Sequence, residues 1–222
     1  MADPVTRWLR EWNAQMLSAT LWAWWLPGLC AMAVLGGAPP FDAAPASAEP
    51  FDGEGYRNAS YRAPVERDPA PAQRIALPAA MALHPGRDAL FLDVLPAPGA
   101  RRDPATGRWA LTEPHDTIAG ARWWPEAGRA SPDRGLWRAF AAQVARFRRR
   151  HADAPVVVFC RADCWMSWNA ARRLSLGGAG GVWWLAEGIE GWHAAGGRLV
   201  PAVPENAAAT QNAPRSETGR AP

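Results

Sequence analysis

The chain has 222 residues, of which 49% are hydrophobic and 20% are charged, so it can form one domain of ordinary size with tails. The formal net charge is only +3, and the basic residues, which are arginines apart from four histidines, are scattered along the chain. Because no basic stripe with interleaved aromatic residues is present, the composition argues against a nucleic-acid-binding protein.

The N-terminal region has the pattern of a secretory signal peptide. An uncharged apolar run covers residues 16–35 and follows two arginines, and small residues after it end in Ala46-Ser47-Ala48, a pattern typical of a signal cleavage site. We therefore expect a signal peptide over residues 1–48 and a periplasmic location. The apolar run is also long enough to cross a bilayer, so an uncleaved anchor is one alternative and a buried N-terminal helix is another. The membrane would be contacted only through this segment.

Two further regions are expected to lie outside the folded domain. Residues 49–74 are rich in Pro, Ala and Gly, which predicts a linker and then an extended segment lying on the domain, with Tyr56 and Tyr61 as candidate anchors. Residues 204–222 are polar and rich in Pro and Ala, which predicts a disordered tail. The folded domain is therefore expected over residues 75–203.

Within that domain, predicted strands and helices alternate. We expect, in chain order, a helix over 77–84, a buried strand over 89–94, a long loop over 96–116, a turn and short strand over 117–125, a helix over 135–151, a strand over 156–159, a helix capped by Ser167, a strand over 182–185 and a short helix within 187–196. This alternation predicts an α/β fold, with a mostly parallel sheet and helices on both of its faces.

The stretch most suggestive of chemistry follows the strand Val156-Val157-Val158-Phe159. Cys160 comes directly after this strand, Cys164 lies in the tight loop that follows, and Ser167 is placed to cap the next helix. A strand, a loop and a helix in this order aim backbone N–H groups at one point. A cysteine at that point would have a stabilised thiolate and a lowered pKa.

Cys160 and Cys164 are the only cysteines beyond the expected signal peptide, which contains Cys30. Outside the cytoplasm, two neighbouring thiols tend to be oxidised or catalytic. We predict that Cys160 is the reactive thiolate, able to accept a sulfane sulfur, and that Cys164 resolves a persulfide or sulfenic acid or forms a disulfide with it. A buried structural cysteine and a lasting structural disulfide are the alternatives. Two cysteines with four scattered histidines predict no metal site, and no cofactor is expected.

Carboxylates also end or follow predicted strands. Asp93 ends one strand as Cys160 ends another, and the carboxyl ends of parallel strands meet at one edge of a sheet. We expect Asp93 to orient a loop near the cysteine, with a structural hydrogen-bond role as the alternative. Glu187 and Glu190 are candidate acid/base groups at the same edge, with solvated loop carboxylates as the alternative.

Four landmarks in this order resemble the rhodanese-like domain superfamily, over about residues 75–203. They are Phe91-Leu92-Asp93-Val94, a strand ending in Asp; Thr117-Ile118-Ala119-Gly120-Ala121, a turn entering a strand; Val158-Phe159-Cys160, the strand that delivers the catalytic cysteine; and Val182-Trp183-Trp184-Leu185 with Gly188, Gly191 and Trp192, the closing strand and its Gly-x-x-x-Trp element. The resemblance implies a rhodanese-like fold with Cys160 as the catalytic residue.

Within that superfamily, the chain is most similar to the PQQ-dependent catabolism-associated CXXCW motif proteins, which are periplasmic and encoded near quinoprotein alcohol dehydrogenases. The loop that carries this likeness contains Cys160, Arg161, Ala162, Asp163, Cys164, Trp165, Met166 and Ser167, and the resemblance implies a helper role in PQQ-linked alcohol oxidation. Rhodaneses usually close this loop with an Arg that holds an anionic sulfur substrate. Here Trp165-Met166 stands in that place and the loop is one residue longer, which weakens the expectation of thiosulfate sulfurtransferase activity. Arg161 is the candidate substitute cation.

Two functions are therefore expected from different classes. In the first, Cys160 and Cys164 carry sulfur transfer or thiol redox chemistry with a small sulfur species or thiol, as an accessory to PQQ-dependent alcohol oxidation. In the second, a non-catalytic module uses a Trp-rich loop face to bind a quinoprotein dehydrogenase or its cytochrome partner. The paired cysteines favour the first function, and the missing loop Arg favours the second.

Overall fold

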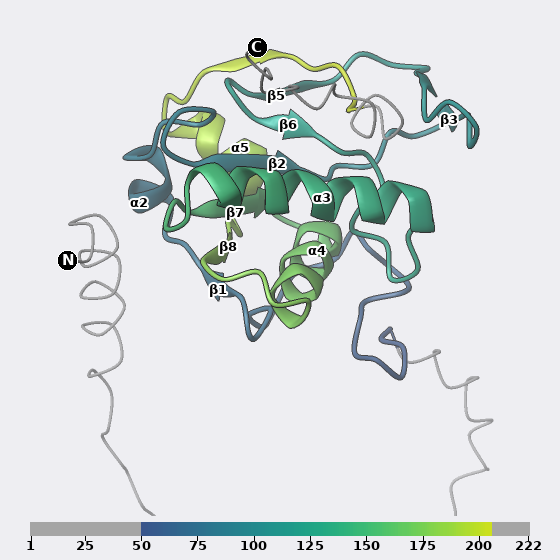
Figure 1. The fold of residues 1–222 in the computed structure, drawn as a ribbon, viewed down its shortest axis with the longest axis horizontal. Coiled ribbons are helices and arrows are strands. Elements are labelled where there is room, and N and C mark those ends of the chain that lie inside the picture. The colour runs from purple at the N-terminus through teal and green to yellow at the C-terminus, as the bar shows by residue number, and fades with distance from the viewer. Residues whose placement is uncertain (1–49, 206–222) are drawn as a thin grey trace, which may run out of the picture. The chain divides into compact units, whose positions relative to one another are not determined.

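A five-stranded parallel sheet forms the centre of the computed structural model, which describes residues 50–205 (Figure 1). The elements are β1 (Gln73–Arg74), α2 (Leu77–Met81), β2 (Leu90–Asp93), β3 (Arg101–Arg102), β4 (Trp109–Ala110), β5 (Asp116–Ile118), β6 (Arg122–Trp123), α3 (Arg134–Arg150), β7 (Val156–Phe159), α4 (Trp165–Leu176), β8 (Val182–Trp184), α5 (Gly188–Ala194) and β9 (Leu199–Pro201). The strand order is β1-β8-β7-β2-β6, and every neighbouring pair is parallel. The predicted α/β fold with a mostly parallel sheet is confirmed.

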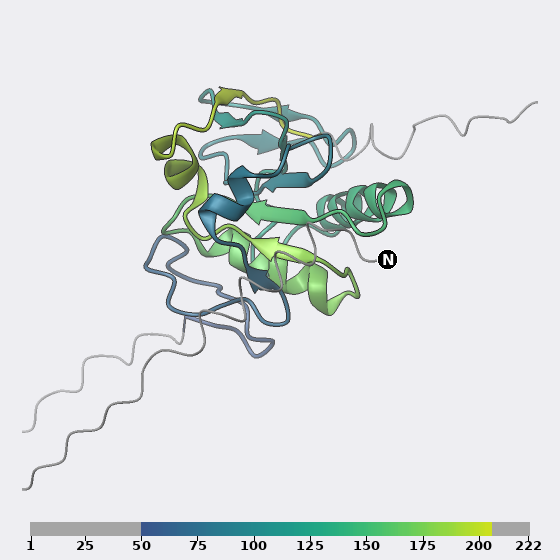
Figure 2. The same cartoon turned by 90° about the vertical axis from the view of Figure 1, so that its left-hand side faces the viewer.

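The two central strands, β2 and β7, are buried on both faces, as their continuous apolar runs predict. Their side chains alternate between the faces. Leu92 and Val158 belong to the core cluster under α3 and α4, whereas Phe91 packs against Phe159 and against Trp192 of α5. Figure 2 shows α3 and α4 on one side of the sheet and α2 and α5 on the other.

The longest helix, α3, begins and ends where its sequence indicates. Asp133 is the N-cap and its side chain accepts a hydrogen bond from the Leu136 backbone N–H at 2.8 Å. Leu136, Phe140 and Val144 form the buried stripe, and three arginines occupy the last turn, where cations stabilise the helix dipole. The predicted helix over 135–151 is confirmed to within one residue at each end.

Several short strands were not predicted. The expected loop over 96–116 contains the hairpin β3–β4, and β9 pairs with β5 in a separate antiparallel ladder. The edge strand β1 precedes residue 75, where the domain was expected to begin. The strands β1, β3, β4 and β9 have two or three residues and none of these residues is fully buried, so no buried apolar run marks them as it marks β8.

The ends of the described region also differ from expectation. Pro204 forms a bridge with Trp123, and the Glu205 N–H donates to the Trp123 carbonyl at 2.8 Å, so the start of the expected disordered tail is hydrogen-bonded to β6. The expected signal peptide, Cys30 and residues 206–222 of the expected tail lie outside the described residues. Among residues 50–205, no helix combines the length and hydrophobicity needed to span a membrane.

Candidate thiol site

Cys160 leaves the carboxyl end of β7 on the face of the sheet that α4 covers. It continues the alternation of Val156 and Val158, and all three belong to the same core cluster. Cys164 is the N-cap of α4, whose first residue is Trp165. The prediction that Ser167 caps this helix is therefore wrong: the helix begins two residues earlier, and Ser167 lies buried within its first turn.

Ser167 connects the thiol to the sheet through a buried hydrogen-bond network. Its Oγ lies 3.0 Å from Cys160 Sγ, and its backbone N–H donates to the same sulfur at 3.4 Å. The indole N–H of Trp184, on the neighbouring strand β8, donates to Ser167 Oγ at 3.0 Å. Cys160 Sγ also donates to the Cys164 carbonyl at 3.2 Å. The sequence placed Ser167 near the thiol, and it suggested Trp184 as a core residue beside the loop but not as a hydrogen-bond donor to Ser167.

The two thiols are free and buried, each with 1% of its surface exposed, and their pKa values move in opposite directions. Burial raises the pKa of Cys160, the neighbouring Cys164 adds to this rise, and the hydrogen bonds from Ser167 oppose it. The pKa of Cys164 is lowered, chiefly by its interaction with the Cys160 thiol and then by backbone hydrogen bonds from Met166 and Arg161, against the effect of burial. Burial and the neighbouring thiol thus oppose the lowering of the pKa that the sequence predicted for Cys160.

A segment over residues 51–67, called the strap below, covers the cysteine loop. The Trp165 N–H donates to the Tyr61 carbonyl and the Ala63 N–H donates to the Asp163 carbonyl, both at 2.9 Å. Arg62 and Cys164 form an isolated antiparallel β-bridge between these two segments. The Arg62 side chain lies 2.7 Å from the Asp163 carboxylate. These contacts place the strap over Cys164, and Cys160 is buried with Val158 and Trp184 in the core cluster.

The strap is held to the domain by aromatic contacts. Phe51 packs edge-on against Trp165, with the ring centroids 5.3 Å apart, and against Trp168 at 6.1 Å. The guanidinium of Arg67 lies over the Phe51 ring at 3.8 Å. The sequence suggested that Tyr56 and Tyr61 anchor this segment. Tyr56 is buried, and the Tyr61 hydroxyl accepts a hydrogen bond from the Ala130 N–H at 3.0 Å.

Asp93 does not meet the thiols. It pairs in register with Phe159, and strand alternation turns its side chain to the face opposite Cys160. Its buried carboxylate accepts hydrogen bonds from the Leu95 N–H at 2.8 Å and the Thr117 hydroxyl at 2.7 Å, and it lies 2.7 Å from His115 Nε2. Asp93 therefore orients the long loop before β5. None of the hydrogen bonds of Asp93 involves either sulfur, so the structure gives no support to a catalytic role for this residue.

The remaining loop residues contact α5. Arg161 Nε lies 2.7 Å from the Glu190 carboxylate, whose second oxygen accepts the Ala162 N–H at 3.2 Å. The Ile189 N–H donates to the Cys160 carbonyl at 2.9 Å, which brings Gly188 against the loop with φ +61°. A Cβ at Gly188 would lie 2.6 Å from the Cys160 carbonyl oxygen, so this close approach requires glycine. Glu190 therefore positions the loop.

A cavity of about 350 Å³ lies beside this loop, although neither thiol lines it. Its lining residues are Arg62, Leu95, Pro96, Ala97, Pro98, Leu111, Thr112, Glu113, Pro114, His115, Trp123 and Arg161. Each basic residue of this lining is paired with a carboxylate: Arg62 with Asp163, Arg161 with Glu190 and His115 with Asp93. Among the described residues, the cavity therefore has no free cation to hold a small anion. Arg62 and His115 were not predicted as members of the site, because only the fold brings them to this edge.

In the part of the chain that the structure describes, no group of three or more His, Cys, Asp or Glu residues is arranged to hold a metal ion. No protein-family model, curated protein or solved structure matches the chain.

Proposed function

We propose that the protein is a periplasmic rhodanese-like protein whose Cys160–Cys164 pair carries thiol redox chemistry or sulfur transfer, as an accessory to PQQ-dependent alcohol oxidation. The observation that carries the chemical part is the meeting of two free, interacting thiols at the carboxyl end of the central strand β7. The reactive groups of parallel sheets typically lie at this edge.

The rhodanese-like assignment is supported by the places of the sequence landmarks in the sheet. The Asp93 strand, the Cys160 strand and the Trp184 strand are β2, β7 and β8 of one parallel sheet, with β7 between the other two. Gly188 and Trp192 lie on α5, which follows β8 directly. The proposed periplasmic location and the quinoprotein context depend on the likeness of the cysteine loop and on the expected signal peptide.

Between the two reactions, thiol–disulfide exchange is favoured. The Cys164 thiolate attacks one sulfur of a substrate disulfide, the substrate S–S bond breaks, and the first thiol leaves with a proton from solvent. Cys160 then loses its proton and attacks Cys164 Sγ, which releases the second thiol and forms the Cys160–Cys164 disulfide. Two electrons pass from the protein thiols to the substrate. Cys164 is the N-cap of α4 and accepts the Met166 backbone N–H, which stabilises its thiolate, whereas Cys160 is buried against Ser167. These positions suit the two roles, which reverse the roles expected from the sequence.

Sulfur transfer is the second reaction of the same thiols. A cysteine thiolate would attack the outer sulfur of thiosulfate, the S–S bond would break, sulfite would leave with the electron pair, and a persulfide would remain. Arg161 is the only candidate cation within the loop, and its pairing with Glu190 partly neutralises it. This pairing is the reason for placing sulfur transfer second.

The non-catalytic alternative requires an exposed aromatic face. Trp165, Trp168, Trp184 and Trp192 are each no more than 6% exposed and pack in the core, and Trp183 alone of the tryptophans expected on this face is half-buried. A module that binds a quinoprotein dehydrogenase or its cytochrome partner would therefore use another surface. The thiol hypothesis needs no such change, so it is preferred.

Intact mass spectrometry of the protein, purified without reductant, tests the proposal. Thiol redox chemistry predicts a mass two hydrogens lower that reductant restores and that thiosulfate does not change. A product one sulfur atom heavier after thiosulfate, absent from Cys160→Ser or Cys164→Ser, would establish sulfur transfer instead. Free thiols that ignore both an added disulfide and thiosulfate would refute the chemical proposal.

The order of the thiols is tested by alkylation with iodoacetamide across a pH series. Peptide mapping of the native protein after limited labelling reports the two thiols separately. Labelling of Cys164 should rise at a pH below the ordinary thiol range of about 8.5, and labelling of Cys160 only above that range. Comparing pH midpoints rather than absolute rates separates ionisation from access under the strap. The opposite order would return the nucleophile's role to Cys160.

A further inference from the structure

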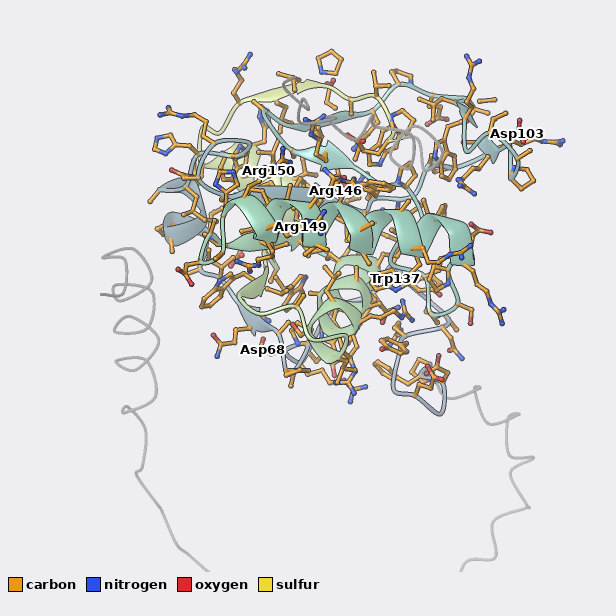
Figure 3. The ribbon with its side chains drawn as sticks, in the orientation of Figure 1. Asp68, Asp103, Trp137, Arg146, Arg149 and Arg150 are labelled. Carbon is orange, nitrogen blue, oxygen red and sulfur yellow. The ribbon has the colours of Figure 1, made fainter. Side chains whose placement is uncertain are left out.

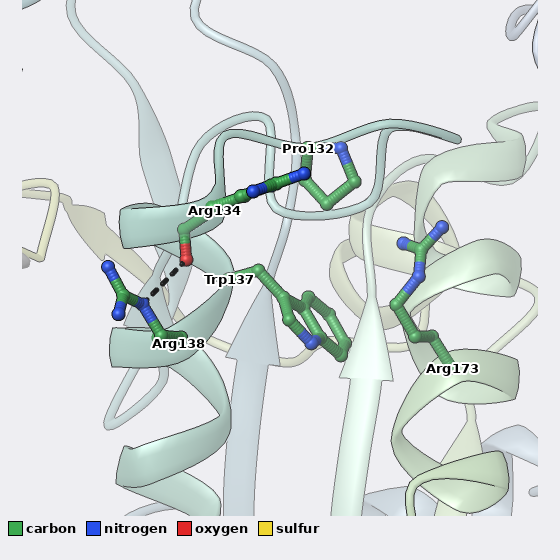
Figure 4. Close-up of a pocket in the computed structure, with 5 residues that line it drawn as sticks. All are labelled: Pro132, Arg134, Trp137, Arg138 and Arg173. Carbon is green, nitrogen blue, oxygen red and sulfur yellow. Dashed lines mark hydrogen bonds between the residues drawn. The ribbon is translucent and has the colours of Figure 1, made fainter.

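A second cavity, of about 470 Å³, lies between α3 and α4, away from the cysteine loop (Figure 4). Its lining residues are Pro132, Arg134, Trp137, Arg138 and Arg173. Trp137 projects from the first turns of α3 into the space between the helices, and Arg173 projects from α4 on the other side of it. The cavity therefore has one flat aromatic wall between guanidinium groups.

The arginines that line this cavity make its charge positive, and Asp52 and Glu54 of the strap partly offset that charge at Arg173. The α3 sequence contains six arginines and no Asp or Glu. Arg134 and Arg138 line the cavity beside Trp137, whereas Arg146, Arg149 and Arg150 lie toward the other end of the helix (Figure 3). Within residues 50–205, neither Arg134 nor Arg173 forms a salt bridge with a carboxylate. The nearby carboxylate of Asp133 caps α3 and pairs with Arg102 at 3.1 Å.

Arg173 is held rigidly at the cavity. Its guanidinium lies over the ring of Tyr56 at 3.9 Å and near the ring of Trp137 at 5.1 Å, and it donates to the backbone carbonyls of Arg129 and Ala130. Burial lowers the pKa of Arg173, although its charge persists at neutral pH. A partly desolvated cation that is fixed by backbone contacts offers an anion a preorganised partner, because little side-chain freedom is lost on binding.

We propose that this cavity binds a small carboxylate attached to a planar apolar group. The planar guanidinium groups of Arg134 and Arg173 match the geometry of a carboxylate, and the Trp137 indole and Pro132 ring supply apolar contact for the flat part of the ligand. The volume lies within the range of small-molecule sites. A bare oxyanion such as sulfate would leave the aromatic wall unused. The site is separate from the thiols, so it stands whether or not the proposed thiol chemistry does.

Isothermal titration calorimetry of the full chain with benzoate tests the proposal, with sulfate and the neutral analogue benzamide as comparison ligands. Benzoate should bind at one site and more tightly than either comparison ligand. Arg134→Gln should weaken benzoate binding about tenfold, as expected for the loss of one charge-assisted hydrogen bond. Arg134 is exposed and its side chain makes no hydrogen bond among the described residues, so the variant should fold.

Arg149→Gln is the matched control, because Arg149 is an exposed arginine of the same helix that does not line the cavity. It should leave benzoate binding unchanged. Absence of benzoate binding, or sulfate binding as tight as that of benzoate, would overturn the proposal. Equal weakening by both variants would show a diffuse basic surface and would also overturn it.

Discussion

At the residue scale, the reactivity of Cys160 depends on where the Ser167 hydroxyl proton points. An indole N–H can only donate, so the contact from Trp184 occupies a lone pair of Ser167 Oγ and leaves the hydroxyl proton for another acceptor. The acceptors within reach are Cys160 Sγ at 3.0 Å and the Cys164 carbonyl at 3.5 Å. When Cys160 ionises, its sulfur becomes the stronger acceptor, and Ser167 stabilises the thiolate.

Replacing Ser167 by Ala should therefore raise the pKa of Cys160 further, since the hydroxyl lowers it in the native protein. The thiolate absorbance of the Cys164→Ser variant, titrated with and without Ser167→Ala, measures this shift. The replacement also leaves the buried Trp184 N–H without its partner, which costs about 1–3 kcal/mol in the free energy of unfolding. Ser175→Ala, in a less buried part of the same helix, should change neither quantity. An unchanged titration would show that Ser167 is only structural.

The raised pKa of Cys160 also makes the stability of the folded protein depend on pH. The folded protein keeps this proton at a pH where the unfolded chain has already lost it. The contribution of Cys160 to stability is therefore complete below the unfolded thiol pKa of about 8.5 and is lost as the pH rises toward the folded pKa.

At the scale of elements, the strap controls access to the thiols. Its ion pair between Arg62 and Asp163 leaves about half of each side chain exposed, so water screens it and it contributes little. The apolar contact of Phe51 with Trp165 and Trp168 removes surface from water and carries more of the attachment. Opening of the strap is thus limited by Phe51 more than by the ion pair.

Phe51→Ala should make the strap open more often and speed the labelling of both thiols about tenfold, which corresponds to roughly 1.4 kcal/mol of lost contact. Arg62→Ala should change the rate far less. The measurement is the rate of reaction with a small aromatic disulfide at neutral pH, together with amide hydrogen exchange of residues 57–63. Equal rates in Phe51→Ala and the native protein would mean that the thiols react without strap opening.

The sequence predicts an element when the element has a clear apolar pattern or is long. The strand β7 and the helix α3 are long or strongly patterned, and their residues identify them. The strap has no periodic pattern, and its hydrogen bonds to the cysteine loop join residues about 100 positions apart in the chain, as in the pair Arg62 and Asp163. Sequence analysis predicts that the segment lies on the domain but cannot identify the surface that it covers.

At the scale of the whole molecule, strand register decides which predicted site residues meet. Cys160, Cys164 and Arg161 were predicted together because they are neighbours in the sequence, and they are neighbours in space. Asp93 was placed with them because it ends a strand at the same edge of the sheet, yet its register with Phe159 turns it to the other face. Register between β2 and β7 is a tertiary property that two separate apolar runs do not encode.

Asn169 joins three segments of the molecule that lie far apart in the sequence. Its side chain accepts a hydrogen bond from the Arg57 N–H at 2.9 Å and donates to the Arg57 carbonyl at 2.8 Å and to the Gly128 carbonyl at 3.0 Å. The residue is fully buried on α4, so none of these bonds competes directly with water. One amide group thus holds the strap and the loop before α3 against the cysteine helix.

Asn169→Ala should therefore destabilise the fold more than any surface substitution, since it leaves the backbone partners of all three hydrogen bonds unsatisfied. At about 1 kcal/mol for each bond, the loss is about 3 kcal/mol in the free energy of unfolding, or roughly 6–12 °C in the melting temperature of a domain of this size. Thermal and urea denaturation measure the loss, and Asn58→Ala, at an exposed strap residue, is the control. If the strap detaches more easily than the core unfolds, thiol labelling should accelerate in Asn169→Ala well below the melting temperature. A variant that melts early but keeps its thiols protected until global unfolding would show that strap and core unfold as one unit.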